Sequence, residues 1–110
     1  MPAAIAEFAR RLAKAWSLDT SSRWSAARPA LGQCSVTALV VQDVFGGELL
    51  KTRVGDAWHF YNLIDGSRFD LTAEQFETAI SYDDLPASRE DAFSDTSPGQ
   101  YRSLRTALGL

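Results

Sequence analysis

Residues 32–47 read Gly32-Gln33-Cys34-Ser35-Val36-Thr37-Ala38-Leu39-Val40-Val41-Gln42-Asp43-Val44-Phe45-Gly46-Gly47. Drawn as a helix, this stretch has apolar side chains on most of its sides, and a helix of that kind lies inside a protein. The β-branched residues leave a buried strand over 36–41 as an alternative. The closing Gly46-Gly47 pair favours a helix over 33–46, because glycine is common just after the last turn of a helix.

Cys34, the only cysteine of the chain, falls in the first turn of this expected helix. Free backbone N–H groups and the positive end of the helix dipole surround that turn. Such surroundings stabilise a thiolate and make a cysteine more nucleophilic at neutral pH. The structural alternative is a small buried residue without chemistry, which is the usual role of a lone cysteine in an apolar helix. A catalytic role therefore requires a base elsewhere in the sequence.

Composition sets limits on the class of protein. The chain has 110 residues, the size of one domain, and a net charge of −3 without a basic block, which argues against a nucleic-acid partner. The longest apolar run, Ala38–Val41, is too short to cross a membrane. Charged residues from Glu7 onward interrupt any signal peptide, and a single cysteine suits a reducing compartment, so we expect a cytoplasmic protein.

The remaining elements follow from periodicity and turn residues. Apolar residues at helical spacing predict a helix over 2–17, with Pro2 in its first turn. After the central helix, alternating residues predict a three-stranded meander over 48–71, whose strands are 48–54, 57–64 and 67–71. The turns between them are Gly55-Asp56 and Asp65-Gly66.

The C-terminal third contains fewer signals. Capping-box spacing after Thr72 predicts a short helix over 72–79, and residues 81–97 have the composition of an acidic surface loop. Ser97-Pro98 predicts a last helix over 98–108. The whole chain, 1–110, is thus expected to form one α+β domain, with the buried central helix packed on a small antiparallel sheet.

A base for Cys34 is available only at His59, the single histidine, in the second strand. A tight turn at Asp65-Gly66 pairs residue 64 with 67, which makes 59 and 70 diagonal neighbours about 7–8 Å apart on one face. The Asp70 carboxylate can then hold the imidazole in one tautomer and stabilise the imidazolium. Cys34, His59 and Asp70 together form a candidate catalytic triad of nucleophile, base and orienting acid.

Each residue of the candidate triad could also have a purely structural role. A histidine on a strand is often a hydrogen-bonded core residue, and Asp70 could assist the N-terminus of the next helix. For the oxyanion, the candidates are the Cys34 N–H group and the Gln33 side chain, which could equally cap the helix. For the substrate, the candidates are the aromatic residues Trp24 and Tyr61, although such residues are more often part of the core. One cysteine and one histidine cannot build a usual structural zinc site, and the carboxylates of 81–95 lack ligand spacing, so we expect neither metal nor cofactor.

These residues carry a resemblance to a known family. The chain resembles the YunG-type family of small bacterial proteins over about residues 16–80, through Gly32–Asp43, Gly46–Leu50, His59–Asn62 and Asp70–Phe76, with Thr20–Trp24 upstream. More distantly, the order of helix-borne cysteine, strand histidine and strand aspartate is similar to the papain-like superfamily, which includes NlpC/P60 and transglutaminase-like hydrolases. The resemblance implies a papain-like core and thiol-acyl chemistry. The chain departs from papain in lacking a second domain and an oxyanion glutamine several residues before the cysteine.

Two functions are consistent with these observations. The first is a cysteine-dependent hydrolase or acyltransferase that uses Cys34, His59 and Asp70 on an amide, ester or thioester of a small molecule or peptide. The alternative is a non-catalytic binding or accessory protein on the same scaffold, acting as a homodimer or with a partner enzyme. A redox role for Cys34 is disfavoured because no second cysteine could resolve it.

Overall fold

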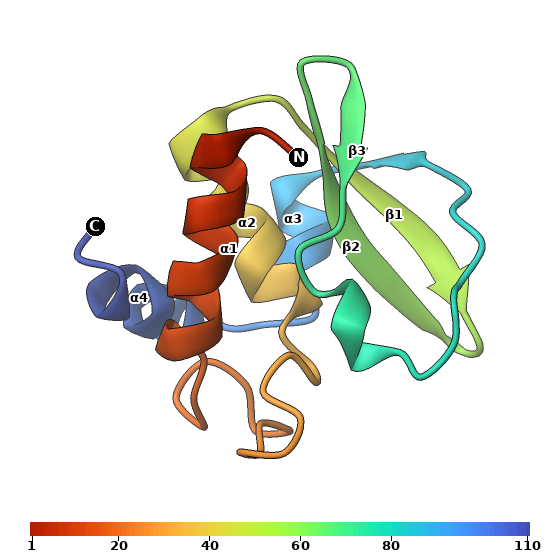
Figure 1. Cartoon of the computed structure of the whole chain (residues 1–110). Coiled ribbons are helices and arrows are strands. Elements are labelled where there is room, and N and C mark those ends of the chain that lie inside the picture. The colour runs from red at the N-terminus through yellow and green to blue at the C-terminus, as the bar shows by residue number, and fades with distance from the viewer.

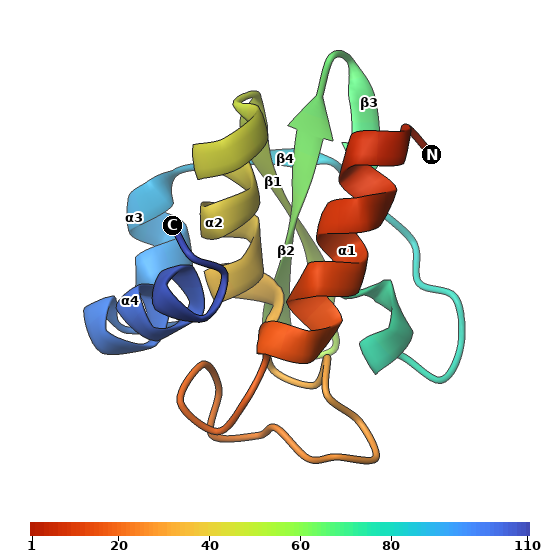
Figure 2. The ribbon, with the colours of Figure 1, turned by 60° about the vertical axis from the view of Figure 1, so that its left-hand side comes forward.

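Helix α2, Cys34–Phe45, lies at the centre of the structure, and the computed structural model describes all 110 residues (Figure 1). Every residue of its first two turns, Cys34–Val41, is buried. Helix α1 (Ala3–Ala15) packs beside it, and the Trp16 Nε1 group donates a buried hydrogen bond of 2.9 Å to Thr37 Oγ1 of α2. Figure 2 shows α2 between α4 (Pro98–Ala107) on one side and the sheet on the other.

The sheet has four antiparallel strands in the order β3-β2-β1-β4. Their bounds are β1 Glu48–Val54, β2 Ala57–Ile64, β3 Ser67–Phe69 and β4 Leu85–Ala87. The predicted pairing across the Asp65-Gly66 turn is confirmed, because Ile64 pairs with Ser67. The α+β class predicted from the sequence is therefore confirmed.

The two faces of β2 have different neighbours, as strand alternation predicts. Phe60 and Asn62 face α2, and the Asn62 side chain donates a hydrogen bond of 3.0 Å to the Ala38 carbonyl. His59 and Tyr61 point to the opposite face, where segment 70–84 covers them through contacts with Phe76, Tyr82 and Asp84.

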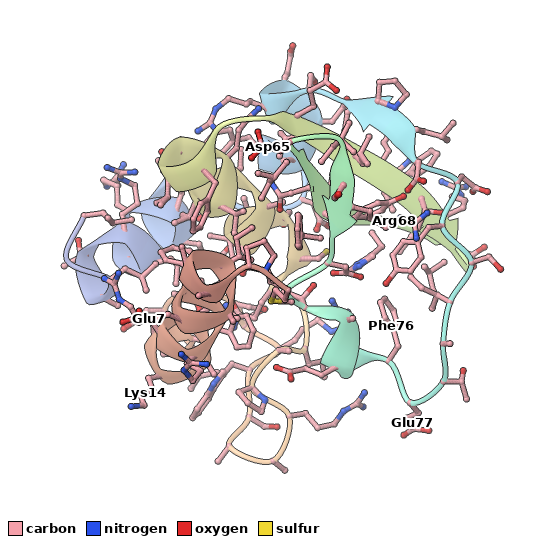
Figure 3. The ribbon with its side chains drawn as sticks, turned by 45° about the horizontal axis from the view of Figure 1, so that its top comes forward. Glu7, Lys14, Asp65, Arg68, Phe76 and Glu77 are labelled. Atoms are coloured by element: carbon pink, nitrogen blue, oxygen red, sulfur yellow. The ribbon has the colours of Figure 1, made fainter.

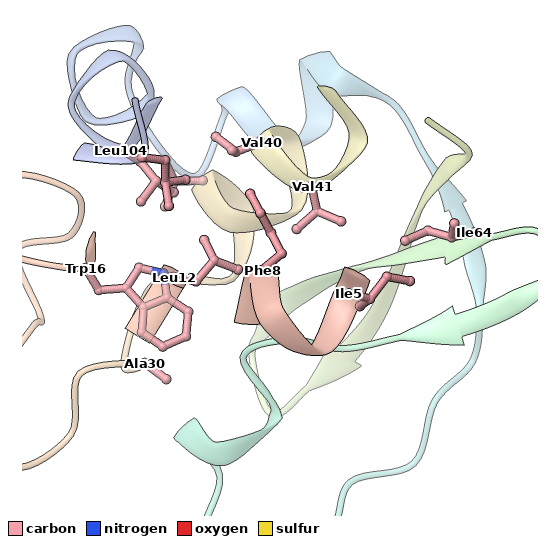
Figure 4. Packing of buried hydrophobic residues seen from close by; sticks show 11 residues of the cluster. Ile5, Phe8, Leu12, Trp16, Ala30, Val40, Val41, Ile64 and Leu104 are labelled. Carbon is pink, nitrogen blue, oxygen red and sulfur yellow. The ribbon is translucent and has the colours of Figure 1, made fainter. Parts of the chain in front are cut away.

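Two apolar clusters meet on α2. The larger cluster joins α1 to α2 and α4, and Figure 4 shows its residues, among them Ile5, Phe8, Leu12, Val40, Val41 and Leu104. The smaller cluster joins α2 to the sheet and contains Cys34, Ala38, Leu39, Leu49, Phe60 and Ala92. None of the helices has the length and hydropathy that a membrane span requires.

The predicted acidic loop over 81–97 is wrong. The segment contains β4, which pairs with β1 and makes a fourth strand, and α3 (Arg89–Phe93). Ser88 begins α3 with a capping box, in which its side chain accepts from the Asp91 N–H and the Asp91 side chain accepts from the Ser88 N–H. Pro86 is tolerated in β4 because that strand lies at the edge of the sheet.

Three further elements are shorter than predicted, and the first is α1, which ends at Ala15 and not at residue 17. The expected helix over 72–79 is only a 3-10 turn, η1 (Ala73–Gln75), because the Thr72 side chain bonds Asp70 and Gln75 and does not cap the turn. Strand β3 ends at Phe69, two residues earlier than predicted, and pairs only with Asn62–Ile64 of β2. The edge of β2 at His59 consequently has no strand neighbour on that side.

Candidate functional site

His59 and Asp70 form the centre of the candidate site. His59 is 2% exposed, and its Nε2 lies 2.7 Å from Asp70 Oδ2. Asp70 directly follows the end of β3, and the tight hairpin carries it to the position that the predicted register gave. Phe76 extends from the chain after η1 and packs edge-on against the imidazole, with ring centroids 4.8 Å apart (Figure 3). The orientation of the imidazole ring is thus fixed by one carboxylate and one aromatic ring.

A hydrogen-bond network fixes the Asp70 carboxylate in turn. Tyr82 Oη donates to Asp70 Oδ2 at 2.7 Å, and the Thr72 N–H donates to Asp70 Oδ1 at 3.2 Å. Thr72 Oγ1 accepts from the Gln75 side chain at 3.0 Å, and Gln75 Oε1 accepts from the Gly32 N–H at 3.4 Å. The network therefore extends from the carboxylate to the loop that leads into Cys34.

Cys34 begins α2 and lines the same pocket as the imidazole. Burial lowers the pKa of His59, but hydrogen bonding and charge from Asp70 and from the Cys34 thiol outweigh it and raise that pKa from 6.5 to about 9. Because Asp70 occupies Nε2, the ring nitrogen left for the thiol is Nδ1, which is buried and makes no hydrogen bond of regular geometry. Catalytic hydrogen bonds are often long or poorly aligned before substrate binds.

A pocket of about 500 Å³ opens onto Cys34 and His59. Four parts of the chain form its walls: the loop that leads into α2, the β1–β2 hairpin, the η1 region and the stretch around the start of α4. Trp58 is 38% exposed and lines the pocket at its rim. The cationic groups of Lys51 and Arg53 lie 4.7 and 4.8 Å from the centroid of its ring. The thiol and the imidazole are therefore accessible from one concave surface.

The three predicted oxyanion and substrate-binding side chains do not line this pocket. Gln33 is fully buried, and its Oε1 accepts a hydrogen bond from Thr20 at 2.8 Å. Trp24 packs against the larger apolar cluster, and Tyr61 is held by Asp84, to which its hydroxyl donates at 2.9 Å. Tyr61 contacts the site only from behind, where its ring stacks on His59 at 5.8 Å.

Several residues of the site were missed by the sequence reasoning. Arg23, Arg28, Gln75 and Phe76 line the pocket, and Tyr82 bonds Asp70. Arg23, Arg28 and Tyr82 come from segments without helical or strand periodicity, so no pattern placed their side chains relative to Cys34. Gln75 and Phe76 come from the segment predicted as a helix over 72–79, which forms only a 3-10 turn. Tyr82 precedes the carboxylates that led to the acidic-loop prediction. No group of three or more His, Cys, Asp and Glu side chains gathers in a way that could hold a metal ion.

Comparisons with known proteins agree with one another on the family. The family model described as YunG protein matches residues 4–109. The protein YunG of Bacillus subtilis (strain 168) is 53% identical over 97 residues, which cover 88% of this chain and 84% of that relative. No solved structure shows a significant match. Nearly the whole domain, including the pocket and the hydrogen-bond network of Asp70, lies inside the matched range, and the chain therefore belongs to the YunG family.

Proposed function

We propose that the protein is a cysteine-dependent hydrolase or acyltransferase with a papain-like arrangement of Cys34, His59 and Asp70. The observation that carries the proposal is that the two ring nitrogens of His59 have different surroundings. Nε2 bonds a fixed carboxylate, Nδ1 is buried and has no hydrogen-bond partner, and His59 shares its pocket with the only thiol of the chain. A nucleophile, a base and an orienting acid within one pocket are the requirements of thiol-acyl catalysis.

In the proposed reaction the Cys34 sulfur attacks the carbonyl carbon of an amide, ester or thioester. The proton of the thiol resides on His59, whose raised pKa of about 9 favours the imidazolium at neutral pH. As the bond to the leaving group breaks, His59 donates that proton to it and an acyl thioester remains on Cys34. Water, or an acceptor nucleophile, then attacks the thioester while His59 takes up its proton and the thiolate leaves.

The backbone at the start of α2 supplies candidate donors for the oxyanion. The first hydrogen bond of the helix runs from the Thr37 N–H to the Gln33 carbonyl, so the N–H groups of Cys34, Ser35 and Val36 have no hydrogen-bond partner in the chain. Of these groups, the Cys34 N–H is the one that the sequence suggested. Negative charge on a carbonyl oxygen is stabilised at such a helix N-terminus.

Alkylation of Cys34 by iodoacetamide as a function of pH tests this proposal. An unassisted thiol with a pKa of about 8.5 is about 1% ionised at pH 6.5. We therefore expect the wild type to react at least about tenfold faster at pH 6.5 than His59→Gln, and the two rates to converge above pH 9. Cys34→Ala serves as the blank, and circular dichroism checks that each variant is folded.

The opposite result has a clear meaning. Identical pH profiles for the wild type and His59→Gln would contradict a thiol activated by His59. That outcome would favour the alternative, a non-catalytic binding or accessory protein. A second readout is the acetyl adduct left on Cys34 by p-nitrophenyl acetate, measured by mass spectrometry, which should be absent in Cys34→Ala.

A further inference from the structure

Two arginines on the rim of the pocket have no carboxylate partner. Arg23 makes no side-chain hydrogen bond, and neither Arg23 nor Arg28 takes part in any of the ion pairs of the chain. Both side chains line the pocket that contains Cys34 and His59. The other arginines near carboxylates, such as Arg68 with Asp84, are paired within the protein. The two rim guanidinium groups therefore remain available to a ligand.

Both arginines are held in place although they belong to an irregular loop. One nitrogen of the Arg28 guanidinium donates to the main-chain carbonyl of Gln75, and its other donors remain free. The side chain of the same Gln75 belongs to the network of Asp70. The aliphatic stem of Arg23 lies against Gly32, where a Cβ added to the glycine would come within 3.0 Å of Arg23 Cβ and 3.2 Å of Cδ. The Arg23 stem thus lies beside the residues that lead into Cys34, and the Arg28 guanidinium is tied to the η1 region.

The charge of the pocket is opposite to the charge of the chain. Among its lining residues the formal charges are those of Arg23, Arg28 and Asp95, with His59 as an additional cation when protonated. The chain as a whole carries −3. A planar guanidinium matches a carboxylate with two parallel hydrogen bonds, and few neutral groups use its donors as fully. Trp58 and Phe76 add an apolar wall for the carbon skeleton of a ligand.

We infer that the pocket binds an acyl substrate that bears a carboxylate, with Arg23 and Arg28 holding this group while the reactive carbonyl faces Cys34. The inference rests on the proposed function for the role of Cys34. The carboxylate site itself is independent of whether the thiol reacts. The inference narrows the proposed substrates from any amide, ester or thioester to those with an anionic group near the bond that breaks.

Competing alkylation by iodoacetate and iodoacetamide tests the inference, because the two reagents share one chemistry and differ in a carboxylate. The measured quantity is the ratio of the iodoacetate rate to the iodoacetamide rate. We expect the double variant Arg23→Gln/Arg28→Gln to lower this ratio about tenfold, with the iodoacetamide rate little changed. Arg10→Gln, on an exposed face of α1 outside the pocket, is the matched control and should keep the wild-type ratio. An equal ratio in the double variant would overturn the inference.

A second measurement separates this inference from the proposed function. Cys34→Ala is titrated with N-acetylglycine and, in parallel, with its neutral amide, while NMR follows the indole N–H signal of Trp58. Shifts caused by the carboxylate alone, and lost in Arg23→Gln/Arg28→Gln, would support the anion site even if the thiol proved inert. Equal responses to both compounds, or no response to either, would overturn it.

Discussion

At the scale of single residues, the site depends on how one carboxylate oxygen is shared. Asp70 Oδ2 accepts from His59 Nε2 and from Tyr82 Oη, both at 2.7 Å. Each donor stabilises the negative charge of the carboxylate. The hydrogen bond from Tyr82 therefore weakens the attraction between Asp70 and the His59 imidazolium. Tyr82 is therefore a positioning residue, which fixes Asp70 and moderates its effect on the imidazole.

Tyr82→Phe should raise the pKa of His59 further, because the carboxylate then acts on the imidazole alone. It should also lower the free energy of unfolding by about 1.5–3 kcal/mol, the usual contribution of a hydrogen bond to a charged group. His59 is the only histidine, so its ring signals report the titration directly by NMR.

Tyr61→Phe is the matched control for Tyr82→Phe. It removes the hydroxyl that bonds Asp84, on the same face of the sheet, and keeps the ring that stacks on His59. We expect a similar loss of stability without a change in the His59 titration. A His59 pKa that moves equally in both variants would show that Tyr82 acts only through packing.

The contact of His59 with Asp70 could be predicted from the sequence, whereas that of Tyr82 could not. A two-residue turn fixes the register of a hairpin, and the register fixes which residues are diagonal neighbours. Tyr82 reaches Asp70 from an extended segment 12 residues away, which has no periodic pattern to give its direction. Arg28 escaped prediction because its segment also has no periodic pattern, and Gln75 did so because the expected helix over 72–79 is only a 3-10 turn.

At the scale of elements, α2 is bounded by glycines with positive φ at both ends. Gly32 has φ +75°, and a Cβ there would lie 2.5 Å from Ser21 Oγ. Gly46 also has φ +75°, but a Cβ there would meet no atom within 4 Å. The first glycine therefore allows the loop of Ser21 and Arg23 to pack against the start of α2, and the second only ends the helix.

Substitution of each glycine by alanine should distinguish a glycine that only ends the helix from one that is also needed to form the pocket. Gly46→Ala should lower the free energy of unfolding by about 1–3 kcal/mol through backbone strain and leave alkylation of Cys34 unchanged. Gly32→Ala should be at least as destabilising and should also slow alkylation, because the displaced loop carries the wall of the pocket. Equal alkylation rates in both variants would contradict this role for Gly32.

The element that sequence reasoning missed has a physical explanation. Strand β4 pairs with β1 across more than 30 residues, and its three residues contain Pro86, which argues against a strand when only local sequence is considered. Its stability comes from pairing with β1 and not from its own sequence pattern. The capping box of Ser88 and Asp91 was a readable signal for α3, but the neighbouring carboxylates made the segment look like solvent-exposed loop.

At the scale of the whole molecule, the pocket exists because segments from Ser21 to Gln100 converge on the start of α2. The α+β class and the packing of the central helix on the sheet follow from the periodicity of apolar residues, which can be recognised within each segment alone. The convergence of the loops depends on tertiary contacts such as the Arg28–Gln75 bond, which join residues 47 positions apart. The fold class and the His59–Asp70 contact were therefore open to prediction, whereas the cationic rim was not.

Because the pKa of His59 is raised, the free energy of unfolding of the whole domain should depend on pH. The folded state holds the imidazole proton up to about pH 9, whereas an ordinary histidine releases it near 6.5. Between these values the folded state binds more protons than the unfolded state, so stability falls as the pH rises. The contribution is complete below about pH 6.5, is lost through about pH 9, and amounts to at most about 3 kcal/mol.

Urea unfolding of Cys34→Ser between pH 6 and 9.5 measures this effect without titration of the thiol. We expect the free energy of unfolding to decrease with pH in that background, by less than the full amount because the contribution of Cys34 to the His59 pKa is removed. The free energy should become nearly flat when Asp70→Asn is added, because the neutral amide no longer favours the imidazolium. The carboxylates whose pKa values are lowered, Asp84 and Asp91, titrate well below this window and add no slope there. A slope that persists in the double variant would show that a group other than the His59–Asp70 pair couples protonation to folding.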